Sequence, residues 1–354
     1  MYVIVAILVF GVLIGTHELG HFLAAKACGV KVNEFAIGMG PKLLKKQGKE
    51  TLYTLRALPI GGFCAMEGED GDSADPRAFT SQSAWKRLII LAAGVTMNFL
   101  FGLVLIFVVF AGTSGFLTPT ITSFMDGCPY EGEDAFLAGD TIYKIDGERT
   151  YFSSNVSTFL SRAGDRPVDI VVIRDGNRIT LRNMHLERTV ESTDSAGNKI
   201  LQYGFRFGIK ETGFGAKLKY SWYCALDFVR MIRLSLIDLF TGSVGVKDLS
   251  GVVGIVSMIN DVGQSAPSVR IAFENIAYLA AFIAINLAVM NLLPIPALDG
   301  GRILFLILTW IVEHIIRRKI DPKYEGYVHA AGLVLLVGLM LFVMYNDVVR
   351  LIVR

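Results

Sequence analysis

The chain has 354 residues, of which 53% are hydrophobic and only 19% are charged, and its mean hydropathy is +0.50. This composition excludes a single water-soluble domain and is typical of a protein that crosses the bilayer several times and carries a soluble part. The net charge of +2, with Lys and Arg spread along the chain, gives no indication of nucleic-acid binding. The cysteines are far apart and form no CxxC pair, so we expect them to be packing residues.

Four long apolar runs predict transmembrane helices. They are Met1–Thr16 continuing to Ala25, Leu88–Ala111, Asn275–Leu298 and Val328–Asn346. Each of the last three has about the 20 residues that a helix needs to cross the bilayer, and the first reaches this length only if it includes its HELGH segment. The first run has no basic flank and no small-residue cleavage site, so we interpret it as a retained span.

Basic residues predict the orientation of these spans. Ten Lys or Arg lie from Lys26 to Arg87, and the short loop expected after the third span adds Arg302, Arg317, Arg318, Lys319 and Lys323. Because basic loops tend to stay in the cytoplasm, we expect the N-terminus and the segment between the second and third spans to lie outside.

The segment from Gly29 to Glu67 is rich in glycine and in alternating apolar residues, which predicts short strands. In water, apolar side chains such as Phe35, Ile37 and Phe63 would be unfavourably exposed, so we favour strands that dip toward the membrane. An ordinary surface hairpin is the alternative. Together with the first two spans, this segment would form an N-terminal membrane domain over residues 1–111.

Residues 112–210 are expected to form a small soluble α/β domain. Its predicted parts are a turn at Asp146-Gly147, a helix over SSNVSTFLSRAG, and the strands PVDIVVIRD and RITLRN joined at Asp175-Gly176. In the following segment, residues 211–274, Tyr220 to Phe240 has helical apolar spacing that suits a helix along the outer membrane surface. A helix packed on the soluble domain is the alternative. Residues 275–354 would form the C-terminal membrane domain.

The stretch THELGHFLAAK carries three ionisable residues inside the first predicted span. His17 and His21 are four residues apart and would project from one face of a helix. Two imidazoles at this spacing can bind one zinc ion, with Glu18 placed to act on a metal-bound water. Two polar residues packed at a helix crossing would be the alternative, but ionisable groups are costly in a membrane helix that does not use them.

A catalytic zinc needs a third protein ligand. His314 and His329 lie near the cytoplasmic ends of spans and His185 lies in the outer domain, and Asp299 in NLLPIPALDGGR is the better candidate. Pro294, Pro296, Gly300 and Gly301 would break the third span around it, and irregular backbone at membrane depth must be buried in protein or line a cavity. The first and third spans are both expected to run from the outside to the cytoplasm, and each carries its motif near its cytoplasmic end. We therefore expect HELGH and LDG at similar depth near the cytoplasmic face. Alternatively, the aspartate marks only the cytoplasmic end of a helix.

With these motifs, the chain resembles the site-2 protease family of intramembrane zinc metalloproteases, in its bacterial RseP/RasP-like type with a single PDZ domain. The likeness rests on HELGH, on NLLPIPALDGG and on AGDTIYKIDGE, and it extends to GMG at 38–40, PIGGF at 59–63 and AAGVTMNF in the second span. HExxH alone is shared with many soluble proteases. The resemblance implies a polytopic α-helical membrane protein with four transmembrane helices, a membrane-re-entrant β element and an inserted extracytoplasmic PDZ-like α/β domain.

The resemblance also implies roles for single residues. His17, His21 and Asp299 would bind one Zn²⁺ per chain, and Glu18 would be the catalytic base. Asn291 would help to hold the substrate strand. The β element would pair with an unwound substrate helix as an added strand, and its matching residues are Gly38, Gly40, Gly61, Gly62 and Phe63. The helix-breaking support of the site would come from Pro294, Pro296 and Gly300.

By the same resemblance, the substrates would be single-span membrane proteins already trimmed outside by an upstream site-1 protease, such as anti-sigma factors, together with signal-peptide remnants. The PDZ-like domain would exclude bulky outer domains or bind a new C-terminus. The chain would reside in the lipid bilayer of the bacterial cytoplasmic (inner) membrane. It departs from the family pattern at Val252, where proline is common, and at FCAM, residues 63–66, which lacks a common lysine.

Two other classes of function remain at this stage. A membrane-anchored PDZ scaffold with a vestigial metal site would not need Glu18, although all four residues that the chemistry requires are present. A metal transporter would need ligands at several depths, whereas the candidate ligands of this sequence cluster at one depth.

Overall fold

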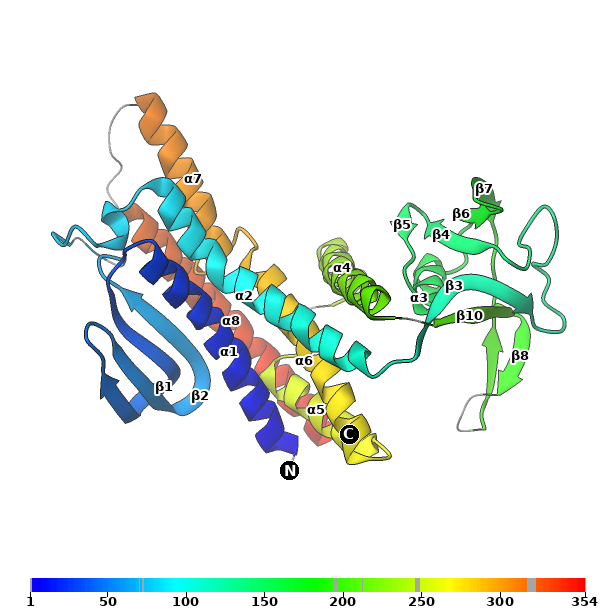
Figure 1. The fold of residues 1–354 in the computed structure, drawn as a ribbon, viewed down its shortest axis with the longest axis horizontal. Coiled ribbons are helices and arrows are strands. Elements are labelled where there is room, and N and C mark those ends of the chain that lie inside the picture. Colours follow the sequence, from blue (N-terminus) through cyan, green and yellow to red (C-terminus); the bar gives the residue numbers. More distant parts are fainter. Residues whose placement is uncertain are drawn as a thin grey trace. The chain divides into compact units, whose positions relative to one another are not determined.

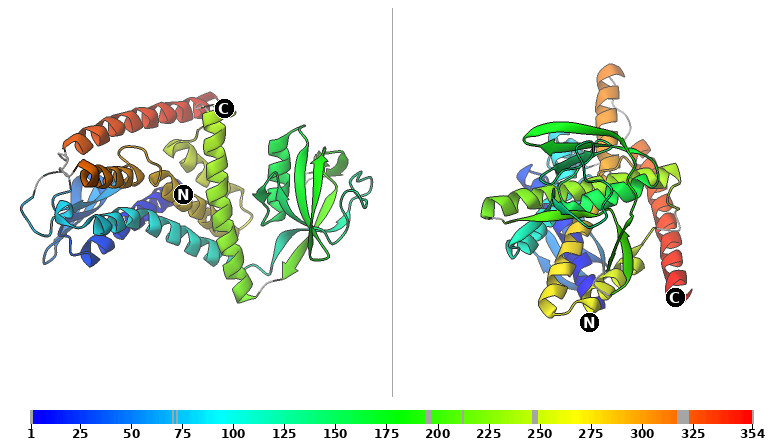
Figure 2. Two further views of the ribbon diagram at one scale, coloured as in Figure 1. Left: turned by 90° about the horizontal axis from the view of Figure 1, so that it is seen from above. Right: turned by 90° about the vertical axis from the view of Figure 1, so that its right-hand side faces the viewer.

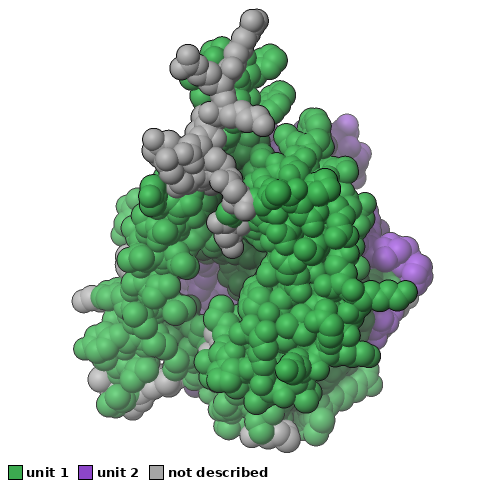
Figure 3. All heavy atoms as spheres, turned by 90° about the vertical axis from the view of Figure 1, so that its left-hand side faces the viewer, with its two compact units in different colours: residues 1–109, 225–354 green, residues 110–224 purple. Residues whose placement is uncertain are grey.

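The computed structural model describes residues 2–69, 71, 73–193, 197–211, 213–245, 249–316 and 323–353. Two compact units emerge, one formed by Met1–Val109 with Ala225–Arg354 and the other by Phe110–Cys224 (Figure 3). The predicted surface segment, residues 211–274, does not coincide with either unit. Its helix α4 (Phe214–Thr241) starts in the second unit and ends in the first, and α5 (Val252–Ser265) belongs to the first.

Within the described residues, four helices are long and apolar enough to cross a membrane, which confirms the four predicted runs. They are α1 (Tyr2–Ala27), α2 (Ala84–Ala111), α6 (Val269–Asn291) and α8 (Lys323–Val353). The labels N and C lie at the same end of this helix bundle (Figures 1 and 2).

The third apolar helix begins and ends earlier in the chain than predicted, at Val269–Asn291 rather than Asn275–Leu298. α6 ends at Asn291 and not at Leu298, because Pro294 and Pro296 have no N–H to continue the helical hydrogen bonds. A separate helix, α7 (Asp299–Ile316), begins at Asp299, so the prediction that LDG lies late in the third span is wrong. Arg302, predicted in a short loop, lies in α7, whereas Arg317, Arg318 and Lys319 lie outside the described residues.

The segment after α1 forms a hairpin of two long strands, β1 (Val32–Gln47) and β2 (Leu52–Met66), rather than several short ones. Residues 34–37 have partners both in 62–65 and in 52–55, so the two strands fold over into a single layer with 34–37 in its middle. Gly38, Gly40 and Gly61 have φ values of +87°, +82° and +84°. Glycine adopts these values without strain, so these residues bend the strands where the sequence suggested that strands end.

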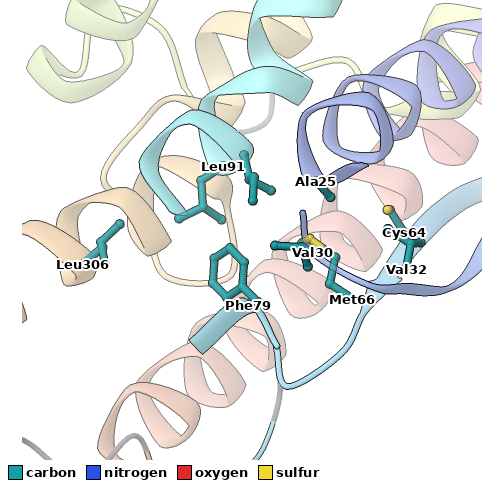
Figure 4. Packing of buried hydrophobic residues seen from close by; sticks show 9 residues of the cluster. Ala25, Val30, Val32, Cys64, Met66, Phe79, Leu91 and Leu306 are labelled. Carbon is teal, nitrogen blue, oxygen red and sulfur yellow. The ribbon is translucent and has the colours of Figure 1, made fainter. Parts of the chain in front are cut away.

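The hairpin is attached to the helices through one hydrophobic cluster (Figure 4). The cluster contains Cys64 and Met66 from the end of β2 and Leu306 from α7, together with residues of α1, α2 and the short turn Phe79–Ser81. Its buried members are Ala25, Val30, Val32, Cys64, Met66, Phe79, Ile90, Leu91 and Leu306. The β layer therefore belongs to the same packed body as the motif-bearing helices α1 and α7.

Small residues let these helices approach closely, as is common in membrane bundles. Gly102 of α2 faces Ile285 and Ala281 of α6, with no room for a larger side chain. α5 packs on α1, where Gly263 lies against the ring of Tyr2. The carboxylate of Asp347 in α8 accepts hydrogen bonds of 2.9 Å from the N–H groups of Gly251 and Gly254 at the start of α5.

The second unit contains the predicted soluble domain. Its sheet has the order β10-β3-β4-β6-β7, with β5 paired to β4, and α3 packs on β3 and β4. The predicted helix and both predicted strands are confirmed as α3, β6 and β7, and both Asp-Gly turns have positive φ. The elements are β3 (Gly115–Phe124), β4 (Thr141–Ile145), β5 (Glu148–Arg149), α3 (Ser153–Ala163), β6 (Val168–Arg174), β7 (Asn177–Met184), β8 (Val190–Thr193), β9 (Lys199–Gln202) and β10 (Phe205–Glu211). The cysteines, in both units, are free: Cys28, Cys64, Cys128 and Cys224.

The polar face of the hairpin yields a test of its stability. Burial raises the pKa of Glu34, but hydrogen bonds from Arg56, Thr54 and Lys42 outweigh this and lower the pKa from 4.5 to about 2. A carboxyl with a lowered pKa stabilises the fold above its unfolded pKa, and this contribution is lost as the pH falls toward 2. We expect Glu34→Gln to lower the melting temperature at pH 7 and to lower it less at pH 3.

The exposed carboxyl of Glu191 serves as the control, since Glu191→Gln should leave the melting temperature unchanged at both pH values. An equal loss for Glu34→Gln at pH 7 and pH 3 would contradict an origin in the charge of Glu34.

Candidate metal centre

Two helices bring three metal-binding side chains together in the first unit. His17 and His21 project from one face of α1, and Asp299 is the first residue of α7. The Nε2 atoms of the histidines lie 3.2 Å apart, and Oδ2 of Asp299 lies 3.2 Å from that of His17 and 3.4 Å from that of His21. Among the described residues, this is the one group of His, Cys, Asp or Glu that could hold a metal ion.

The spacing of these atoms fits a tetrahedral ion. With bonds of about 2.0–2.1 Å, neighbouring ligand atoms around zinc lie about 3.3–3.4 Å apart. Oδ2 of Asp299 is buried and has no hydrogen-bond donor of suitable geometry among the described residues. Three lone-pair atoms that face one another in a buried place repel unless a cation lies between them. The donor set of two imidazoles and one carboxylate is one that zinc prefers.

The second nitrogen of His21 fixes the orientation of its ring. Nδ1 lies 2.9 Å from the backbone oxygen of Ile90 in α2, and a carbonyl can only accept, so Nδ1 carries the proton. The lone pair of Nε2 then points at the cluster. Such an outer hydrogen bond holds a histidine in the tautomer that can bind a metal.

Glu18 lies next to the histidines and close to the β layer. Its side chain is half-buried, and a Cβ added at Gly62 of β2 would be 3.2 Å from Cγ of Glu18 and 3.1 Å from Ile14. The absence of a side chain at Gly62 therefore leaves the room that Glu18 occupies. Of the β residues singled out in the sequence, Gly62 is the one that contacts Glu18 in this way.

The other predicted β residues lie farther along the same layer. Gly38 packs on the backbone oxygens of Leu58 and Arg56, and Gly61 lies against the side chain of Met39. Gly40 is beside Leu58, and the ring of Phe63 is covered by the guanidinium of Arg56 at 4.8 Å. These residues shape the bent layer and do not join the cluster of His17, His21 and Asp299. Asn291 is half-buried at the last position of α6.

The loop before Asp299 is held close to the first turn of α7. Gly300 and Gly301 are inside α7, and a Cβ on either would collide with the backbone of Leu292 or Ile295. The role expected for Gly300 as a helix breaker is thus corrected: it permits the loop with Pro294 and Pro296 to pass over the helix. This contact fixes where Asp299 begins its helix.

α8 also supports this loop, which was not foreseen from the sequence. The N–H of Ala297, a residue with a φ of +75°, donates to Nδ1 of His329 at 2.9 Å. Gly332, one turn farther along α8, lies against Pro296 with no space for a Cβ. A non-glycine residue at positive φ is strained, and it persists where surrounding contacts hold it.

Gly94 of α2 is a second residue that sequence reasoning missed. A Cβ at this position would overlap Nε2 of His21 and lie 2.8 Å from Cε1 of His17. Gly20 of α1 meets the backbone of Ala93 equally closely. The stretch AAG in AAGVTMNF could have indicated this contact, because small residues on one face of a helix allow a neighbouring helix to approach closely.

Comparison with known proteins shows the family of the chain. The model of Peptidase family M50 matches residues 5–339. An inferred zinc metalloprotease of Clostridium acetobutylicum is 35% identical over 354 residues, which cover 98% of this chain and 97% of that protein. A protein of Clostridium perfringens with the same kind of name is also 35% identical, over 99% of both chains. The regulator of sigma-W protease RasP of Bacillus subtilis is 28% identical over 99% of this chain and 98% of its own length.

Substitution of Gly94 tests whether α2 shapes the cluster. We expect Gly94→Ala to displace the imidazole of His21 and to weaken metal binding by about 10- to 100-fold, the usual effect of disturbing the surroundings of a ligand. Metal per chain, measured after dialysis against a graded series of chelator concentrations, reports this loss. Gly11→Ala is the matched control, because a Cβ at Gly11 meets nothing within 4 Å. Equal metal retention by both variants would contradict the role of Gly94.

Proposed function

We propose, from the premise that the chain belongs to peptidase family M50, that it is an intramembrane zinc metalloprotease. Membership of the family makes the chain a zinc metalloprotease, and its four apolar helices make it a multi-pass membrane protein. Our proposal adds that the chain hydrolyses peptide bonds within the transmembrane segments of other proteins. The observation that carries it is the convergence of three atoms that could bind a metal, two on the apolar helix α1 and one at the start of α7.

In this proposal, His17, His21 and Asp299 hold the zinc ion. When bound, zinc polarises the scissile carbonyl and activates water for attack. The hydrogen bond from Nδ1 of His21 to the oxygen of Ile90 keeps the other ring nitrogen free for the metal. Because only three side chains would hold the ion, it would remain accessible to water or substrate, as catalytic zinc sites require.

Glu18 is proposed as the general base and acid. It follows His17 directly and lies against Gly62, so its carboxylate is next to both the metal-binding face of α1 and the β layer. Glu18 would take a proton from the attacking water and deliver it to the leaving amine. The free side of the strand around Gly62 would be the place where the substrate backbone lies.

The β layer is proposed to hold the substrate in extended form. A helical substrate hides its peptide groups in hydrogen bonds, so it must unwind locally before hydrolysis. An unwound segment in the membrane needs new partners for its N–H and C=O groups, because each unpaired group costs several kcal/mol there. Residues 61–63 would supply these partners by strand addition, and Asn291 would help to hold the strand.

The substrates are proposed to be single-span membrane proteins that a site-1 protease has already trimmed, and signal-peptide remnants. The name of RasP in Bacillus subtilis connects that relative with sigma-W, and anti-sigma factors are accordingly our first candidates. The second unit would act as a PDZ-like filter or binding domain outside the cytoplasmic membrane of a bacterium. The basic residues between α1 and α2 support this orientation.

The two alternative functions fit the site less well. A metal transporter needs ligands at several depths, and the described residues contain a single ligand cluster. A scaffold has no use for a carboxylate beside a metal-binding pair, yet Glu18 lies there at the cost of burying an ionisable group.

Substitution of Glu18 tests the proposal directly. The purified chain in detergent should contain about one zinc and cleave a single-span model substrate. Glu18→Gln should keep the zinc but lower the cleavage rate by about 10²- to 10⁴-fold, because it removes proton transfer alone. Asp299→Asn should lose zinc as well as activity.

Zinc content by elemental analysis and cleavage products by mass spectrometry provide the two readouts. If wild type and Glu18→Gln cleave at the same rate, the proposed chemistry is wrong. If zinc is bound but no single-span substrate is cleaved, and cells with either form behave alike, the scaffold function is favoured instead.

A further inference from the structure

The proposed reaction needs a fixed distance between two separate elements. Asp299, on α7, would hold the metal, and residues 61–63 of β2 would hold the substrate backbone. These elements are more than 230 residues apart in the sequence, and only tertiary contacts can set their spacing. One such contact is an ion pair between Arg302 of α7 and Glu69, which follows the end of β2.

Each residue of this ion pair lies near one part of the proposed site, Arg302 near the metal ligand Asp299 and Glu69 near the end of β2. Arg302 comes three residues after Asp299, which on a helix is the neighbouring position on the same face. Glu69 comes three residues after Met66, the last residue of β2, and its Oε2 accepts from the N–H of Met66 at 3.4 Å. The guanidinium of Arg302 donates to Oε1 of the same carboxylate. The carboxylate of Glu69 thus joins the end of the strand to the metal-bearing helix.

The ion pair is partly buried. The side chain of Glu69 is 14% exposed and that of Arg302 is 31% exposed. Leu306, one turn after Arg302 on α7, belongs to the same hydrophobic cluster as Cys64 and Met66 of β2 (Figure 4). This apolar cluster holds the two elements together, but apolar packing is not directional. A hydrogen-bonded charge pair fixes orientation, and losing one member leaves the other charge buried without it.

We propose that Arg302 and Glu69 are positioning residues that fix the substrate strand relative to the metal. Neither would touch the reacting atoms. The inference rests on the proposed function, because it concerns how that reaction is aligned. In the sequence, Arg302 served only as a basic residue that indicates orientation, and Glu69 had no assigned role.

This arrangement makes a specific kinetic prediction. A helical substrate must be unwound and held on the strand, so it depends on alignment, and misplacing a reacting group by about 1 Å costs on the order of 100-fold. A substrate with the same cleavage sequence but with glycine and proline placed to disrupt its helix depends less on the strand. We expect Arg302→Gln to slow cleavage of the helical substrate about 10- to 100-fold, and to slow cleavage of the disrupted substrate much less.

The experiment uses the full-length chain in detergent with both substrates. Arg302→Gln, Glu69→Gln and the exchange Glu69→Arg with Arg302→Glu are compared with wild type, and zinc per chain and melting temperature are measured on each sample. Arg270→Gln is the matched control, since it removes the same charge from an exposed ion pair with Glu274 on α6. The exchanged pair should recover much of the lost rate on the helical substrate.

The outcomes distinguish the positioning role from a general loss of activity, from loss of zinc and from failure of the proposed function. Selective loss on the helical substrate, with zinc and melting temperature unchanged and recovery in the exchanged pair, supports the proposal. Equal loss on both substrates, or loss that follows zinc content, overturns it while the protease function stands. Full activity of Arg302→Gln on the helical substrate also overturns it. If wild type shows no Glu18-dependent cleavage of either substrate, the proposed function itself fails, and the positioning role fails with it.

Discussion

The structure depends on one constraint, which is that three lone-pair atoms must meet inside a bundle of apolar helices. Two of them come from a single helical face, and their convergence with the carboxylate of Asp299 needs a cation to be favourable. Much of the nearby packing serves this geometry. Gly94 leaves room for the imidazoles, the oxygen of Ile90 orients His21, and the loop before α7 is fixed by close glycine contacts.

The β layer is the second part of the structure on which the proposed reaction depends. It is unusual for a connection between two membrane helices to form two strands of about 15 residues, and glycines with positive φ fold these strands back over one another. Gly62 brings one part of the layer to Glu18, and the hydrophobic cluster around Met66 and Leu306 anchors it to α1, α2 and α7. The hydrolytic site that we propose in the membrane would need both parts, since a metal alone would offer no partner for the unwound backbone of a substrate.

Local patterns in the sequence predicted the parts of this structure that local physics determines. The four apolar runs, the HELGH spacing and the Asp-Gly turns of the soluble domain are of this kind. Asp299 was correctly grouped with the histidines, but its place at the start of a new helix was missed, because Asp299, Arg302 and Glu313 interrupt the apolar pattern of α7. Strand length was missed because Gly38, Gly40 and Gly61 bend strands here rather than end them. His329, Gly94 and the pair of Arg302 with Glu69 act across more than 30 residues, where spacing gives no signal.

The most direct test of the central claim is the position of the metal itself. Diffraction data from crystals of the full chain, collected on both sides of the zinc absorption edge, would locate each zinc ion without reference to a model. We predict one anomalous peak per chain, bonded to Nε2 of His17, Nε2 of His21 and a carboxylate oxygen of Asp299 at about 2.0–2.2 Å. A zinc peak elsewhere in the chain, or a fully loaded chain with no peak between these three residues, would contradict the account.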